Sequence, residues 1–288
     1  MTNDKMMNHS NDGLCGGDVL INGTPFRTDH TIFQGTDSRI FSAHSLQGGG
    51  DSAFVIKCFH CVRNDDVWNK AMREIEAAHM LRRCRYIVGL LGHSVRKCGG
   101  EEVEVFLLFD RLECLDGTAV TDRREILAVC RDISLALEAM RRKGLIHGDV
   151  KPSNIYRSDG RWLLSDLGSV CLSGEVLVYG SEGYYSPEAA RSERCDIRSD
   201  IYSLGITCYR LLSGGRLPFC DLPCGEADEG EVYRAIERRL GGEAIPPVPG
   251  VNDDINKLIL KMCEFDRRSR FRKPSDVASA ANLLINRE

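Results

Sequence analysis

The apolar pattern of the chain changes at about Leu112, and this change restricts the folds that are open to it. Before that residue, short apolar runs alternate with Gly-rich turns, a pattern that predicts antiparallel strands. The predicted strands cover residues 31–33, 40–43, 53–59, 91–95 and 103–109. Residues 67–81 differ, because apolar side chains recur there every three or four positions and favour a helix.

Beyond Leu112 the strand pattern nearly stops and helical periods follow one another. Residues 122–142 carry an apolar stripe, with Thr121 as a candidate cap and Gly144 as terminator. Further helices are predicted over residues 200–212, 229–240, 253–263 and 274–285. We therefore predict an α+β fold of two lobes: a small antiparallel sheet with one helix, and a larger, mainly helical part. A ligand is expected in a cleft between the two parts.

These boundaries divide the chain into three parts. Residues 1–25 show no period and are rich in Asn, Asp, Gly and Met, so we predict a flexible tail. Residues 26–112 are predicted to form the first lobe and residues 113–288 the second.

Charge and hydropathy exclude two classes of partner. The chain has 38 Lys and Arg residues against 42 Asp and Glu residues, a net charge of −4, so bulk charge does not favour nucleic acid. Apolar residues make up 42% of the chain, enough for a packed core. No uncharged stretch approaches the roughly 18 apolar residues of a membrane span. We expect a soluble, globular protein.

The 13 cysteines are interpreted as free thiols. Their number is odd and the N-terminus shows no secretory signal, so we expect a reducing, cytoplasmic compartment. Cys58 and Cys61 have the spacing of two zinc ligands, but no second ligand pair lies at a finger-like distance downstream. Buried or loop thiols are the preferred interpretation for this pair and for Cys220 and Cys224.

Residues 146–154 concentrate the groups that can do chemistry. Asp149, Lys151 and Asn154 lie within six residues, and Asp166 follows twelve residues after Asn154. Two carboxylates, a lysine and an amide suit acid–base catalysis, phosphate binding and magnesium coordination. Taken alone, each of these residues could also be an ordinary loop group.

These motifs resemble those of the eukaryotic-type Ser/Thr protein kinase family over residues 30–288. Residues 54–57 are similar to the family's Val-Ala-Ile-Lys strand, and residues 107–112 to its strand-to-hinge segment. Residues 180–188 resemble the end of its activation segment, with Ser-Pro-Glu for Ala-Pro-Glu. The resemblance implies a two-lobed kinase that uses ATP and Mg²⁺ to phosphorylate Ser or Thr hydroxyls of a protein substrate.

The resemblance also implies roles for single residues. Asp149 would accept the proton of the substrate hydroxyl, and Lys151 would contact the transferred phosphate. Asn154 and Asp166 would hold magnesium. Lys57 would pair with the α- and β-phosphates.

Other implied contacts surround these residues. Glu74 is the expected partner of Lys57, with Glu76 as the competing candidate. Glu188 is expected to form a buried ion pair with Arg270, and Asp200 to brace the backbone of the catalytic loop. The residues expected around the nucleotide are Gly35, Ser38, Ile40, Val55, Phe109, Asp110 and Leu112.

Two positions depart from the family pattern. Phe33, Gly35 and Ser38 occupy the three glycine positions of the phosphate-covering loop, so weaker nucleotide binding is expected. Gly148 stands where many kinases that are regulated by activation-segment phosphorylation have Arg. Residues 169–179 offer no dense basic replacement, so constitutive activity or control by a regulatory protein partner is expected.

Two other functions stay open at this point. Small-molecule kinases of the aminoglycoside or choline type share the His-Gly-Asp sequence of residues 147–149, although Lys151 and the activation-segment motif favour a protein kinase. The eroded loop favours a pseudokinase scaffold that binds a partner without turnover. The complete set of lysine, catalytic carboxylate and magnesium ligands opposes it.

Overall fold

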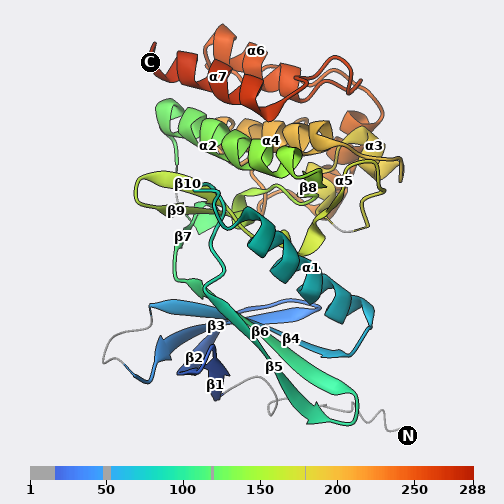
Figure 1. The fold of residues 1–288 in the computed structure, drawn as a ribbon. Helices are drawn as coiled ribbons and strands as arrows, with labels where there is room; N and C mark the ends of the chain where they lie inside the picture. Colours follow the sequence, from blue (N-terminus) through green and yellow to red (C-terminus); the bar gives the residue numbers. More distant parts are fainter. Residues whose placement is uncertain (1–16, 48–52, 118–119, 179) are drawn as a thin grey trace, which may run out of the picture. The chain divides into compact units, whose positions relative to one another are not determined.

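The computed structural model describes residues 17–47, 53–117, 120–178 and 180–288, and the chain divides into two compact units (Figure 1). Unit 1 comprises Met1–Ile75 and Gly89–Arg111, and unit 2 comprises Glu76–Val88 and Leu112–Glu288. The boundary after Arg111 falls one residue before the predicted one. Glu76–Val88 groups with unit 2. The N–H of Val88 donates to the Leu164 carbonyl at 2.9 Å, and the N–H of Leu164 donates to the Tyr86 carbonyl at 2.8 Å.

Unit 1 is built on a six-stranded sheet in the order β1-β2-β3-β4-β6-β5, with every neighbouring pair antiparallel. The helix α1 (Asp66–Leu81) follows β4. The strands are β1 (Asp18–Ile21), β2 (Thr24–Gln34), β3 (Ser38–Ser45), β4 (Phe54–Val62), β5 (Gly92–Gly99) and β6 (Glu102–Asp110). The five predicted strands and the predicted helix are all present, so these predictions are confirmed.

The prediction of a flexible tail is wrong for its last residues. Asp18–Ile21 forms β1, which pairs with the start of β2. Asn22 and Gly23 make the turn between them with φ angles of 51° and 82°. Val19 packs into the core of the sheet. A strand of four residues is too short for its period to stand out from the sequence before it. Residues 1–16 lie outside the described part of the chain.

Two apolar clusters form on the two faces of this sheet. One includes Cys58, and the other includes Cys61 together with Ala71 and Ile75 of α1. Because successive side chains of a strand point to opposite faces, Cys58 and Cys61 cannot bind the same metal ion. Neither cysteine forms a disulfide and both are buried, as predicted.

Unit 2 is mainly helical, with α2 packed against α4 and α7 (Figure 1). Its helices are α2 (Arg123–Arg142), α3 (Pro187–Ala190), α4 (Ile197–Leu212), α5 (Glu229–Leu240), α6 (Asp253–Met262) and α7 (Pro274–Ile285). Its strands are β7 (Glu113–Cys114), β8 (Leu145–Ile146), β9 (Ile155–Ser158), β10 (Arg161–Leu164) and β11 (Cys171–Leu172). They form a sheet in the order β10-β9-β7 and a β11-β8 pair.

The starts of two helices differ from the prediction. Asp122, and not Thr121, caps α2, because its carboxylate accepts a hydrogen bond from the backbone N–H of Arg124 at 3.0 Å. Helix α4 begins at Ile197, where Asp196 provides a cap of the same kind. The short strands of unit 2 were not predicted because two to four residues are too few to show an alternating pattern.

Candidate functional site

The lysine of β4 is paired with the first of the two candidate glutamates. Lys57 Nζ lies 2.8 Å from Glu74 Oε2, and the two side chains are 9% and 3% exposed. Glu76 is exposed. The choice of Glu74 over Glu76 is therefore confirmed. The pair can form because Lys57 lies on the sheet face that α1 covers. Successive side chains of β4 alternate between the two faces, so Lys57 shares this face with Phe59 and Cys61.

Strand register gathers several of the predicted nucleotide residues on that same face. Ile40 is the cross-strand partner of Lys57, and Phe109 is the partner of Val55, which lies two residues before Lys57. Phe109 also packs against the cluster that includes α1. Asp110 pairs with the neighbouring position of β4, so its exposed side chain belongs to the other face.

The phosphate-covering loop is the β2–β3 hairpin. The backbone N–H of Gly35 donates to the carbonyl of Ser38 at 2.9 Å, which closes the turn. A Cβ atom added to Gly35 would lie 3.0 Å from Cε1 of Phe33, so this position has little room for a side chain. At the tip, Asp37 pairs with Lys70 of α1 at 2.8 Å. An ion pair to the helix therefore holds this loop, which has lost two of its glycines.

In unit 2, the candidate catalytic carboxylate is fixed through one of its two oxygens. Lys151 Nζ lies 2.8 Å from Asp149 Oδ2, and Asn154 Nδ2 donates to the same oxygen at 3.1 Å. Asp149 Oδ1 is buried and has no hydrogen-bond partner among the described residues. A buried acceptor of this kind is costly unless a further group uses it. Oδ1 is thus the atom that can accept a proton.

The two candidate magnesium ligands are joined through the backbone. The N–H of Ser165, the residue before Asp166, donates to the carbonyl of Asn154 at 2.9 Å. Asp166 has a left-handed φ of 60°, and its carboxylate accepts the N–H of Gly168 at 3.4 Å. Because the Asn154 amide nitrogen is used toward Asp149, its oxygen is the group that remains for a cation. A carboxylate and an amide oxygen are ligands that fit Mg²⁺.

A fully buried carboxylate holds the catalytic loop. Asp200 of α4 accepts the backbone N–H groups of His147 and Gly148 at 2.7 and 2.9 Å. Burial raises the pKa of Asp200, while the two N–H groups and His147 act in the opposite direction. The predicted bracing role of Asp200 is confirmed.

One residue of this site was missed by the sequence reasoning. Ser181 accepts a hydrogen bond from Lys151 Nζ at 2.7 Å, so Lys151 joins the activation segment to Asp149. The available signal was the hydroxyl residue near the start of the recognised 180–188 motif. No role was predicted for Ser181, because nothing in the sequence showed that the Lys151 side chain contacts it.

The glycine that replaces the usual arginine is required by the backbone. Gly148 has a φ of 82°, and an added Cβ would lie 2.9 Å from Leu177 Cδ2 and 3.0 Å from the Ser169 carbonyl. An arginine here would be strained at this φ, and it would require the Leu177 side chain and the Ser169 carbonyl to shift.

The buried pair of Glu188 and Arg270 is present as predicted. Two bonds of 2.7 and 2.9 Å join the guanidinium to the carboxylate. Its remaining three N–H groups donate to the carbonyls of Arg198, Glu264 and Phe265. Burial raises the pKa of Glu188, but Arg270 outweighs it, so the pKa of Glu188 lies below its ordinary value of 4.5.

The protein kinase domain family matches residues 26–280. The chain therefore belongs to the protein kinase family. Serine/threonine-protein kinase PknL of Mycobacterium tuberculosis is 32% identical over 165 residues, which cover 55% of this chain and 39% of that protein. Inhibitor of nuclear factor kappa-B kinase subunit epsilon of Mus musculus is 26% identical over 246 residues, covering 75% and 33%. The chain thus spans well under half the length of these relatives.

A solved structure shares the fold. The granulovirus kinase PK-1 of Cydia pomonella superposes with a TM-score of 0.68 at 18% identity, covering 88% of this chain and 92% of that one. Together with the family match, this confirms the predicted α+β protein kinase fold. Among the described residues, no helix has the length and apolar character that crossing a membrane requires.

Replacing Glu188 by Gln should lower the free energy of unfolding by about 3–5 kcal/mol, because Arg270 then stays buried without its counter-charge. Urea unfolding of the two proteins measures the difference. Because the folded-state pKa of Glu188 is lowered, its contribution is complete above pH 4.5 and is lost as the pH falls through that lower pKa. The difference between the two proteins should therefore shrink on acidification.

Glu193→Gln is the matched control. Glu193 lies 3.9 Å from Arg191, and both side chains are about half exposed, so the change should cost less than about 1 kcal/mol. Equal losses in the two variants would contradict a special role for the buried pair.

Proposed function

We propose that the chain is a Ser/Thr protein kinase that transfers the γ-phosphate of Mg-ATP to a hydroxyl of a protein substrate. The observation that carries this proposal is Asp149, whose Oδ2 is held by Lys151 and Asn154 while its buried Oδ1 has no hydrogen-bond partner among the described residues. The named serine/threonine kinases among the relatives support the choice of acceptor.

In the proposed reaction, the substrate hydroxyl gives its proton to Asp149 Oδ1 as its oxygen forms the new bond to phosphorus. The bond from phosphorus to the leaving oxygen of ADP breaks, and Lys151 offsets the charge on the transferred group. Lys57 has three N–H donors, so it can keep Glu74 and contact phosphate oxygens. Bound Mg²⁺, held by Asn154 and Asp166, would neutralise phosphate charge.

A protein acceptor is favoured over a small molecule by the way the segment after Ser181 is held. Arg239 of α5 is 3% exposed and donates to the carbonyls of Glu182, Gly183 and Tyr185 at 2.7–3.3 Å. Lys151 holds Ser181 at the start of the same segment. We infer that this fixed backbone next to the catalytic carboxylate positions a peptide.

Asp149→Asn should lower the rate of phosphate transfer about 10²- to 10⁴-fold, because an amide cannot accept the proton. Transfer from labelled ATP to a generic basic protein, with the modified amino acid identified, measures this. The melting temperature and ATP affinity should stay close to those of the parent chain.

Asp159→Asn serves as the control, since Asp159 is exposed in the β9–β10 turn and has a φ of 48° that Asn also accepts. Unchanged turnover in Asp149→Asn would refute the assignment of the base. ATP binding without transfer in the parent chain would point to a scaffold or to a small-molecule substrate.

Ser38→Gly should tighten ATP binding by up to about tenfold, because glycine lets the backbone come closer to phosphate and one additional hydrogen bond has about this effect on affinity. Isothermal titration of Mg-ATP measures the affinity. Ser45→Gly, at the other end of β3, should leave the affinity unchanged. Equal affinities for Ser38→Gly and the parent chain would show that the side chain does not limit binding.

The activation segment is held by backbone contacts instead of a phosphate-binding arginine. Gly174 N–H donates to the Cys195 carbonyl, and Cys195 N–H donates to the Glu175 carbonyl, both at 2.8 Å. Val176 and Arg194 extend this antiparallel contact. With Gly148 closely approached by Leu177, we infer that the segment is ordered without phosphorylation.

Phosphatase treatment should therefore leave the initial rate of transfer unchanged. The rate is measured after the phosphatase is removed, beside a Ser173→Ala variant that lacks a hydroxyl in the segment. A rate that falls on treatment and returns on rephosphorylation of the segment would overturn this inference.

A further inference from the structure

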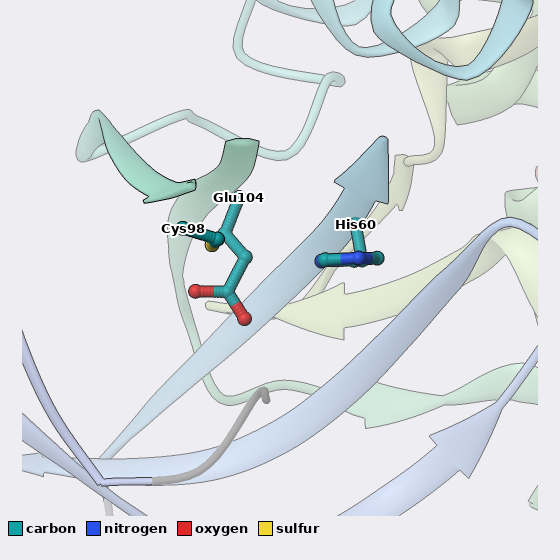
Figure 2. Close-up of side chains that lie close together, drawn as sticks. All are labelled: His60, Cys98 and Glu104. Carbon is teal, nitrogen blue, oxygen red and sulfur yellow. The ribbon is translucent and has the colours of Figure 1, made fainter. Parts of the chain in front are cut away.

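Three side chains that can bind a metal lie side by side at one end of the unit 1 sheet. His60 comes from β4, Glu104 from β6 and Cys98 from β5, three strands that are neighbours in the sheet (Figure 2). Strand register pairs His60 directly with Glu104. One nitrogen, one sulfur and one oxygen of these residues lie within 4.8 Å of one another.

The site is separate from the proposed catalytic machinery. His60 lies three residues after Lys57 on β4, so the two side chains point to opposite faces of the sheet. Lys57 faces α1, whereas His60 and Glu104 lie on the other face, in line with Cys58 and Phe106 of the other cluster.

Glu104 is the candidate ligand that the fold holds most firmly, because it is buried and paired with Arg96. Its side chain is buried, which is unusual for a carboxylate. Arg96, its partner across the β5–β6 pair, donates to Oε2 from Nε at 2.7 Å and lies 2.6 Å from the same oxygen through Nη2. Both contacts involve Oε2, and Arg96 would orient the carboxylate when it binds a cation.

We propose that His60, Cys98 and Glu104 bind a Zn²⁺ ion. Imidazole nitrogen, thiolate sulfur and carboxylate oxygen are the three zinc ligands of proteins, and three of them with one water complete a tetrahedron. Calcium and magnesium, which prefer oxygen ligands only, do not suit this set.

Binding requires the thiolate, so the Cys98 thiol loses its proton to solvent as the sulfur–metal bond forms. The thiolate and the Glu104 carboxylate then supply two negative charges against the two positive charges of the ion and the one of Arg96. The ion would join β4, β6 and the edge strand β5. Its binding energy would add to the stability of the folded sheet.

Cobalt and zinc titrations of the metal-free chain, kept reduced, test the proposal. Co²⁺ should give the near-ultraviolet band of a thiolate ligand and the strong visible bands of a tetrahedral site, and one equivalent of Zn²⁺ should abolish both. Zn²⁺ should also raise the melting temperature of the parent chain.

Cys98→Ser and His60→Ala should each weaken this binding more than about 100-fold and remove the rise in melting temperature. The His60 side chain is exposed and the Cys98 side chain partly exposed, so these variants should fold. Glu104→Gln is not used, because it would change a buried side chain. Cys224→Ser and His79→Ala, which change residues of the same types outside the three candidate ligands, are the matched controls and should bind as the parent chain does.

The outcomes separate the alternatives. Loss of the thiolate band in Cys98→Ser and of tight binding in His60→Ala, but in neither control, establishes the site. Binding that is equal in all five proteins would assign the metal to other thiols and overturn the proposal, as would a parent chain without the thiolate band. None of these readouts depends on kinase activity.

Discussion

The catalytic loop depends on one buried carboxylate. Asp200 accepts two consecutive backbone N–H groups, those of His147 and Gly148. A loop whose backbone turns through a positive φ exposes such donors, and only a fixed acceptor makes this conformation stable. Because α4 supplies the acceptor from its first turn, the position of Asp149 is set by the core of unit 2.

Two buried ion pairs also hold elements of the structure in place. One pair joins Lys57 to Glu74, and the other joins Arg270 to Glu188. Each pair removes two charges from water, which is unfavourable unless the geometry is good and further hydrogen bonds are made. Arg270 meets this condition most fully, since every guanidinium N–H has an acceptor. Such pairs fix one arrangement of their elements, which is what a transfer reaction with strict positional demands needs.

Much of the fold could be predicted because long elements show their period. The strands before Leu112 and the helices after it were found from spacing alone, whereas β1 and the short strands of unit 2 were too brief to give a signal. Some contacts between residues far apart in the sequence could also be predicted, and others could not. Glu188 and Arg270 were paired through the family resemblance, but Ser181 and the trio around Glu104 depend on strand register and side-chain reach, which no local pattern records.

Gly148 shows how one missing side chain has two consequences. A residue with a Cβ would be strained at this φ and would push against the Leu177 side chain and the Ser169 carbonyl, so glycine favours close packing of the activation segment on the catalytic loop. The same absence removes the cation that would otherwise bind a phosphate on that segment. Under the proposed function, a packing contact at Gly148 would replace an electrostatic contact that depends on phosphorylation. The backbone hydrogen bonds of Gly174 and Glu175 with Cys195 agree with this proposal, because they hold the segment without a phosphate group.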